Sequence, residues 1–177
     1  MAFLDDLVAT GREEEALAAV PRERAARAGE RGAMLYGRHP DGRFFLQVDA
    51  QGHRWDPDYP VLNIDWFGAW AYGQWHAEKT GQPWRLPYEL EWEKAARGVD
   101  GRFYPWGDAF DPSWCCVRDS HRGPRLPQVV GAFAGDVGPY GVRDMAGGAW
   151  DWCADIFFQP VSPRIADGRM VLSLIHI

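Results

Sequence analysis

The sequence predicts an α+β domain in which helices come early and a loop-rich region with short strands follows. Three observations lead to this fold class. Apolar residues repeat at helical spacing near the N-terminus and again between residues 66 and 97. The 177 residues are enough for one domain with a hydrophobic core. Twenty glycines and thirteen prolines indicate many turns and few long elements.

The first elements are helical and then extended. Residues 3–19 carry a broken helical stripe, and the interruption at Thr10 predicts two helical pieces. Residues 22–32 are charged and rich in alanine, so they form either a solvated helix or a loose connector. Residues 44–48 are a strand candidate, and residues 60–64 are predicted to form another short strand.

A longer helix with recognisable ends follows. Asp65 is placed to cap a helix from Trp66 to Thr80, because its carboxylate can accept the free backbone N–H groups of the first turn. Gly81 suits a left-handed stop at the other end. We expect this helix to bury one wide face made of Phe67, Trp70, Ala71, Gln74 and Trp75.

A second helix is predicted from Glu89 to Arg97, closed by Gly98. Its expected buried stripe is Trp92, Ala95 and Ala96. Beyond Gly98 no further helix is predicted, and short extended pieces rich in glycine, proline and aromatic residues take over.

Composition limits the possible functions. The formal net charge of −6 disfavours non-specific nucleic-acid binding and attachment to a membrane surface by basic residues. No apolar run approaches the roughly 20 residues of a membrane span. The first residues do not read as a secretory signal, so a cytoplasmic location is the default expectation. The three cysteines, Cys115, Cys116 and Cys153, contain no Cys-x-x-Cys unit and are expected to be structural.

Two dense blocks carry the strongest signal. Residues 84–107 read W-R-L-P-Y-E-L-E-W-E-K-A-A-R-G-V-D-G-R-F-Y-P-W-G, and residues 140–152 read Y-G-V-R-D-M-A-G-G-A-W-D-W. With these motifs the chain resembles the formylglycine-generating enzyme family, also called sulfatase-modifying factor domains, over residues 3–169. The resemblance implies a C-type-lectin-like variant of the α+β fold, with two helices, a loop-rich region of short strands and little regular structure. Some of its pieces look like copies that accompany bacterial serine/threonine kinases.

The resemblance also implies a calcium site in the second block. The matched ligands are the side chains of Asp144 and Asp151 and the backbone carbonyls of Gly147 and Ala149. A hard cation takes several oxygen ligands, and a glycine-rich loop lets carbonyl groups converge. The alternative is that the two aspartates only hydrogen-bond within a tight turn.

Three positions depart from the family pattern. Tyr88 stands where the family has a helix-capping Thr, so that cap is expected to be lost; Gly148 replaces an Asn, and Asp151 replaces a Glu. Other matched residues are expected to be structural. We expect Arg85, Glu91 and Arg97 to form buried ion pairs that hold the loops. Seven tryptophans are expected to lie in the core: Trp66, Trp70, Trp75, Trp92, Trp106, Trp150 and Trp152.

Active members of the family oxidise a cysteine of a sulfatase to formylglycine, using oxygen and copper held by a cysteine pair; soft thiolates suit copper(I). That pair follows an Arg-Gly-Gly-Ser-Trp motif which the 177 residues do not contain. We therefore expect no copper site and assign no catalytic residue here.

In the intact protein the partner is expected to be a protein or peptide substrate. The alternative is a non-catalytic, lectin-like binding or regulatory module fused to a serine/threonine kinase.

The domain organisation is predicted as a partial domain over residues 1–171. Residues 172–177, Leu-Ser-Leu-Ile-His-Ile, read like the translation of a sequencing adapter and are predicted to be a non-native tail. The alternative is an ordinary apolar C-terminal strand.

Overall fold

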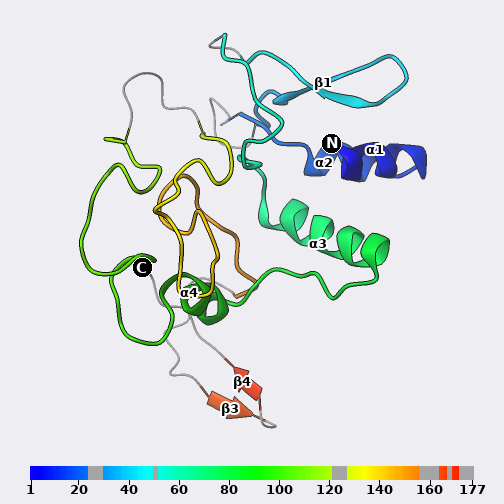
Figure 1. The fold of residues 1–177 in the computed structure, drawn as a ribbon. Helices are drawn as coiled ribbons and strands as arrows, with labels where there is room; N and C mark the ends of the chain where they lie inside the picture. Colours follow the sequence, from blue (N-terminus) through cyan, green and yellow to red (C-terminus); the bar gives the residue numbers. More distant parts are fainter. Residues whose placement is uncertain (24–29, 50–51, 121–126, 156–163, 167–168, 172–177) are drawn as a thin grey trace. The chain divides into compact units, whose positions relative to one another are not determined.

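The structure is a computed structural model that describes residues 1–23, 30–49, 52–120, 127–155, 164–166 and 169–171 (Figure 1). The chain divides into two compact units: an N-terminal unit of Met1–Arg85 with Gln128–Val130, and a C-terminal unit of Leu86–Pro127 with Gly131–Ile177. The described residues hold four α-helices and two small antiparallel sheets, in agreement with the predicted α+β class. No helix among them is long and apolar enough to cross a membrane.

The N-terminal unit begins with the two predicted helical pieces, α1 (Ala2–Ala9) and α2 (Glu13–Ala19). Thr10 ends α1, because its hydroxyl donates to the carbonyl of Asp6 at 2.8 Å, and Gly11 then turns the chain at φ 78°. Both helices pack on α3. The hydrophobic core of this unit consists of Phe3, Leu4, Leu7, Ala16, Val20 and Phe44.

A hairpin of β1 (Tyr36–Arg38) and β2 (Phe44–Leu46) completes this core (Figure 1). The carboxylate of Asp5 accepts the backbone N–H of Phe44 at 2.8 Å and so ties α1 to β2. The predicted strand at residues 44–48 is confirmed but shorter, and β1 was not predicted. The strand predicted at residues 60–64 is wrong: Asn63 has a φ of 58°, a left-handed conformation that breaks an extended run.

The helix α3 (Trp66–Thr80) has the predicted ends. The Asp65 carboxylate accepts the Gly68 N–H at 2.7 Å, and Gly81 is left-handed at φ 67°. Its predicted buried face is wrong in part, since Phe67 is 73% exposed. The side that meets the core is the neighbouring stripe, where Gly68 is buried and Ala71 and Trp75 pack against the core cluster.

The C-terminal unit contains α4 (Glu89–Arg97), which ends before Gly98 as predicted and buries Ala96. Among the described residues no helix follows it. The backbone packs closely here, because a Cβ at Gly138 would lie 2.7 Å from the Ala95 carbonyl oxygen. A second hairpin, β3 (Arg164–Ala166) with β4 (Arg169–Val171), was not predicted. The suspected tail at 172–177 lies outside the described residues.

The expectation that seven tryptophans form the core is wrong. Trp150 is 90% exposed, and Trp70 and Trp152 are about half exposed. Trp66, Trp75, Trp92 and Trp106 are only partly buried. Two phenylalanines, Phe3 and Phe44, and four smaller or aliphatic residues make up the N-terminal core instead, and of the seven tryptophans Trp75 packs against it.

Candidate functional site

The candidate site is built on α4 and on the loop at residues 143–155, both in the C-terminal unit. The first residue of α4 is held by a distant side chain: the Asp155 carboxylate accepts the Glu89 N–H at 2.5 Å. Glu91 reaches back to the N–H of Tyr88 at 2.9 Å. The capping box of Tyr88 and Glu91 is present, so the expected loss of the cap is not borne out, and Asp155 adds a carboxylate from elsewhere in the chain that also suits the positive end of the helix dipole.

One turn further along, the indole N–H of Trp92 donates to Asp151 Oδ2 at 3.0 Å. This bond joins the two sequence blocks on which the family resemblance rests. Asp151 keeps exposed surface, yet surrounding protein atoms desolvate its carboxyl. This burial raises the pKa of Asp151, and the hydrogen bond from Trp92 opposes the rise.

The loop between the matched aspartates is shaped by left-handed residues. Asp144 has a φ of 58°, and its Oδ2 accepts the Gly131 N–H at 2.6 Å. Gly147 and Gly148 have φ values of 77° and 73°. The Gly148 N–H donates to the Cys116 carbonyl at 2.6 Å. A Cβ on Gly147 would lie 2.3 Å from that same oxygen, so only glycine fits there.

The structure also reveals a buried carboxylate that the sequence analysis missed. Asp136 is 1% exposed, and its Oδ2 accepts the Ala146 N–H at 2.9 Å. Its backbone carbonyl accepts the N–H of Asp144. Burial raises the pKa of Asp136, and the nearby charge of Asp144 adds to the rise. Asp136 therefore holds the loop through hydrogen bonds to the backbone of Asp144 and Ala146. Its place between Gly135 and Gly138 was the available signal, because closely packed backbone often uses glycine.

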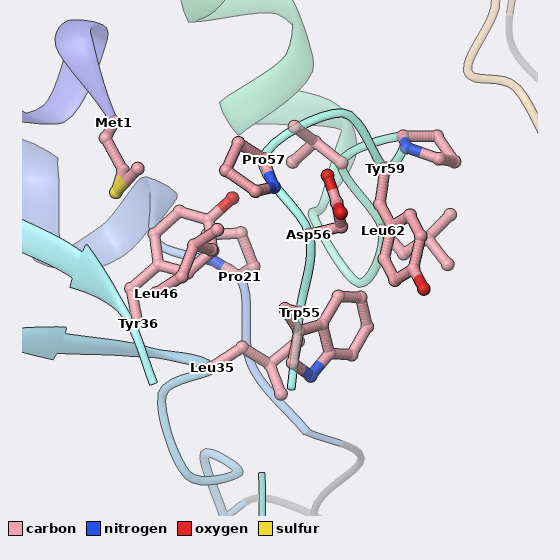
Figure 2. Close-up of a pocket in the computed structure, with 12 residues that line it drawn as sticks. Met1, Pro21, Leu35, Tyr36, Leu46, Trp55, Asp56, Pro57, Tyr59 and Leu62 are labelled. Atoms are coloured by element: carbon pink, nitrogen blue, oxygen red, sulfur yellow. The ribbon is translucent and has the colours of Figure 1, made fainter. Parts of the chain in front are cut away.

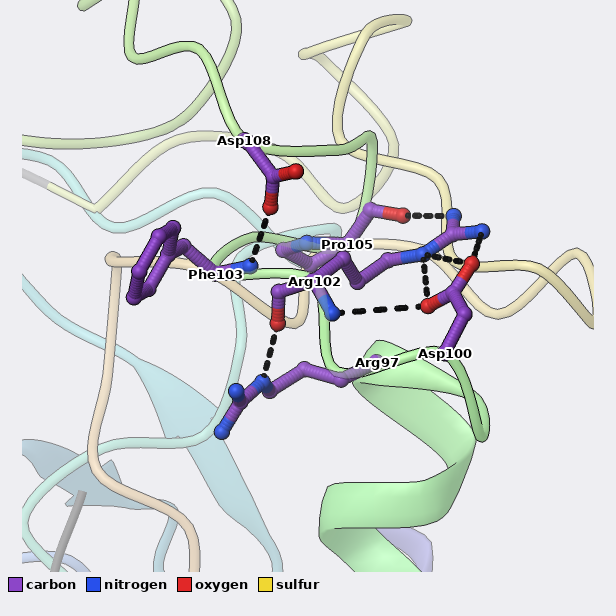
Figure 3. Close-up of polar contacts among 6 residues, drawn as sticks. All are labelled: Arg97, Asp100, Arg102, Phe103, Pro105 and Asp108. Atoms are coloured by element: carbon purple, nitrogen blue, oxygen red, sulfur yellow. Dashed lines mark hydrogen bonds and ion pairs between the residues drawn. The ribbon is translucent and has the colours of Figure 1, made fainter.

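A network of arginines fixes the turn after α4 (Figure 3). Arg97 donates to the carbonyl of Arg102 at 2.6 Å and pairs with Glu93 at 2.8 Å. Arg102 in turn donates to the Pro105 carbonyl and pairs with Asp100 at 2.6 Å, which lowers the pKa of Asp100 to about 2. The neighbouring Trp106 donates its indole N–H to the Ala109 carbonyl at 2.7 Å.

The other residues expected to be structural are placed differently. Arg85 and Glu91 are exposed, so the expectation that they form buried ion pairs is wrong; Arg97 alone of the three is partly buried. Trp150, expected in the core, lies almost wholly in solvent.

The oxygens that could hold a hard cation are those of Asp144, Gly147, Ala149 and Asp151. In each aspartate Oδ2 accepts an N–H, while Oδ1 accepts no hydrogen bond from the described residues, which leaves a carboxylate oxygen for a cation. The Gly147 carbonyl accepts the Ala149 N–H at 2.8 Å and retains its second lone pair. These ligands are all oxygen atoms, the type of ligand that calcium prefers. No cluster of three or more His, Cys, Asp or Glu side chains suited to a metal occurs in the described ranges.

The thiols do not fit the copper centre that the resemblance implies. Cys115 is 1% exposed, and burial raises its pKa. Burial, with the nearby charges of Asp155 and Glu89, raises the pKa of Cys153 to about 11. Both shifts disfavour the thiolate form, which is the form that copper(I) takes as a ligand.

Comparison with known proteins places this geometry in a family. The sulfatase-modifying factor enzyme 1-like domain matches residues 37–173. A formylglycine-generating enzyme of Streptomyces coelicolor is 36% identical over 140 residues, which cover 72% of this chain and 39% of that enzyme. An inactive C-alpha-formylglycine-generating enzyme 2 of Bos taurus is 34% identical over 115 residues, covering 59% of this chain and 36% of that protein.

A third relative is the serine/threonine-protein kinase pkn1 of Chlamydia caviae, 35% identical over 98 residues that cover 55% of this chain and 14% of the kinase. The chain thus spans well under half the length of these curated relatives. The family match extends over most of the chain and includes both sequence blocks that Trp92 and Asp151 bring together. The chain belongs to the formylglycine-generating enzyme family, the sulfatase-modifying factor enzyme 1-like domains.

Proposed function

We propose that residues 1–177 form the scaffold portion of a formylglycine-generating-type domain and do not themselves carry out the oxidation for which the family is named. The observation that supports this most directly is the state of the thiols. Cys115 is buried, and burial raises the pKa of both Cys115 and Cys153, so the thiolate form of each is disfavoured. Cys116 alone cannot supply a pair of thiolate ligands.

In the parent protein, the substrate class is a cysteine side chain within a protein or peptide. Support for this comes from the name and the 36% identity of the Streptomyces coelicolor relative. The contribution of the present residues is positional: Asp155, Trp92 and Asp151 fix α4 against the loop that follows it.

Direct assay of the purified chain tests the proposal. The chain is incubated with a Cys-x-Pro-x-Arg peptide, copper and oxygen, and aldehyde is detected with an aminooxy probe and by mass spectrometry. The Streptomyces coelicolor enzyme serves as the positive control. We expect no aldehyde above the protein-free background. Aldehyde that disappears on replacing Cys115, Cys116 or Cys153 by Ser would contradict the proposal.

A second candidate function is a non-catalytic binding or regulatory module of C-type-lectin-like fold, attached to a bacterial serine/threonine kinase. The similarity to the Chlamydia caviae kinase and to an inactive bovine relative favours it. The full open reading frame distinguishes the two. A kinase domain in the same frame, without a cysteine pair after an Arg-Gly-Gly-Ser-Trp motif, supports the module, whereas the cysteine pair supports the oxidase.

We also propose that calcium binds at the loop of residues 144–151. The ligands are carboxylate oxygens of Asp144 and Asp151 and the carbonyls of Gly147 and Ala149. Two carboxylates and convergent backbone oxygens are the ligands that this cation prefers. Its role there would be to hold the loop in place; it would take no part in redox chemistry.

A further inference from the structure

The two units place their aromatic side chains differently. In the N-terminal unit, Tyr36, Trp55 and Tyr59 line a small pocket of about 100 Å³ (Figure 2). In the C-terminal unit, four aromatic side chains form a cluster at the surface: Tyr104, Trp106, Phe110 and Trp114. None of these four belongs to the proposed calcium site, so the aromatic cluster calls for an explanation of its own.

The rings of the aromatic cluster present faces in different directions. Tyr104 and Trp106 stack with their ring centroids 5.3 Å apart and their planes within 5° of parallel. Trp114 stands at 88° to Trp106, with the centroids 5.9 Å apart, and Phe110 is tilted by 41° against Tyr104. Phe110 is 53% exposed and Trp114 38% exposed. Aromatic surface of more than one orientation is therefore open to a ligand, and exposed patches of this kind mark binding sites.

Backbone groups fix two of the rings before a ligand arrives. The indole N–H of Trp106 donates to the carbonyl of Ala109 at 2.7 Å. The backbones of Tyr104 and Gly107 exchange two hydrogen bonds, with N–O distances of 2.9 and 3.1 Å. Because these rings are already held in place, a ligand that packs on them loses little affinity to the ordering of side chains.

The aromatic cluster also carries negative charge. Asp108 and Asp111 stand on either side of Phe110 in the chain, and one oxygen of each accepts a backbone N–H. Neither aspartate forms an ion pair within the described part of the chain. Arg102 interacts with the charge of Asp108, but its guanidinium is paired with Asp100. The charge on these two carboxylates therefore favours a cationic ligand.

A cation over aromatic rings is attracted by their faces, and the attraction is strongest for tryptophan. The ammonium group of lysine and the guanidinium of arginine carry three and five N–H donors, which ring faces leave without acceptors. A quaternary ammonium group has no N–H donor and covers its charge with methyl groups. It therefore fits an aromatic surface that has only a few carboxylate oxygens beside it.

We propose that the aromatic cluster binds a small, free quaternary ammonium compound of the choline type. All four rings come from residues 104–114, so the surface is local and matches a small compound better than a long segment of another protein. A carboxylate on the ligand, as in glycine betaine, is disfavoured because it would be repelled by Asp108 and Asp111.

Ligand-observed NMR tests the proposal, with choline chloride titrated against the 177-residue chain and saturation transfer measured at the methyl signal. Two analogues separate charge from shape. One is the neutral carbon analogue, in which a tert-butyl group replaces the trimethylammonium group, and the other is glycine betaine. We expect saturable binding of choline, weakened about three- to tenfold for each analogue. Absence of saturable choline binding, or equal binding of the neutral analogue, overturns the proposal. Binding of the chain to phosphatidylcholine vesicles without binding of free choline would overturn it as well.

Matched variants locate the binding site. Phe110→Leu removes an exposed ring of the aromatic cluster and is expected to weaken choline binding about three- to tenfold. The control Phe67→Leu removes a ring that is 73% exposed on α3 in the other unit, and should change affinity less than about twofold. Asp108→Asn removes one charge at an exposed position and should also weaken binding. If Phe110→Leu unfolds, Asp108→Asn decides the question, and unchanged affinity in that variant contradicts the proposal.

Discussion

The indole N–H of Trp92 donates to a carboxylate oxygen of Asp151 at 3.0 Å, across 59 positions of sequence. Through this bond the middle of α4 holds the segment just after the glycine-rich loop. Since a carboxylate is a stronger hydrogen-bond acceptor than a neutral oxygen, this bond contributes more to stability than an average hydrogen bond. It is the most direct link between the helix and the proposed cation site.

Replacement of Trp92 by Phe should therefore destabilise the chain. An aromatic ring is kept, but the N–H and part of the indole surface are lost, so we expect a loss of about 0.5–2 kcal/mol in the free energy of unfolding. Urea denaturation measures it. The control Trp84→Phe, at a tryptophan that is 51% exposed, should change stability by less than about 0.5 kcal/mol. Equal effects of the two substitutions would show that the bond to Asp151 contributes nothing.

The cap of α4 can be tested by moving it. Asp155→Ala removes the acceptor of the Glu89 N–H and should cost about 0.5–2 kcal/mol, the usual effect of losing a helix cap. Adding Tyr88→Thr places a small hydroxyl, a favoured N-cap side chain, beside the freed N–H groups and should recover part of that loss, whereas in the presence of Asp155 it should gain less. Thermal unfolding of the four proteins completes the double-mutant cycle. Purely additive effects would argue against Asp155 as the cap.

The ends of the helices could be predicted from the sequence because their signals are local. Asp65 and Gly81 each act on backbone within one turn. The buried face of α3 could not, because it depends on where α1 lies. Trp75 faces α1, where its indole N–H meets Asp6 at 3.0 Å, and Phe67 on the adjacent stripe is left in solvent. Nothing within the sequence of α3 distinguishes these two stripes.

The site was predictable in part for a similar reason. Motif matching identified Asp144 and Asp151, but it could not show which N–H groups they accept. Asp136 and Asp155 were missed because their backbone N–H partners lie 10 and 66 positions away in the sequence, whereas the partner of Asp65 lies within one turn.

Two adjacent glycines in the loop should differ sharply in their tolerance of a side chain. A Cβ at Gly147 would lie 2.3 Å from the Cys116 carbonyl oxygen, whereas at Gly148 the nearest atom is 3.7 Å away. Gly147→Ala should cost several kcal/mol or prevent folding. Gly148→Asn, the family residue, should cost less than about 1 kcal/mol, because Asn tolerates left-handed backbone. Soluble yield and urea midpoints report the difference, and comparable losses at the two positions would contradict this close contact.

The ion pair of Asp100 and Arg102 predicts a small dependence of stability on pH. The hydrogen bonds from Arg102 lower the pKa of Asp100 from 3.8 to about 2. A lowered folded-state pKa gives stability that is present above pH 4 and lost as the pH falls toward 2. The difference in unfolding midpoint between the wild type and Asp100→Asn should therefore shrink across that window, and high salt should reduce it at every pH. A difference that stays constant from pH 5 to 2 would argue against the pair.

Calcium binding at the loop should raise thermal stability, because a ligand that binds only the folded state stabilises that state. At a concentration one hundred times its dissociation constant the ion adds about 2.7 kcal/mol. Differential scanning fluorimetry with excess calcium against excess chelator measures the shift. Asp144→Asn and Asp151→Asn should each abolish most of it, since a neutral amide is a weaker ligand than a carboxylate. Asp119→Asn, which removes an exposed carboxylate outside the ligand set, should keep it. An unchanged midpoint on chelation would rule out the site, and a shift lost equally in Asp119→Asn would show only a general effect of charge.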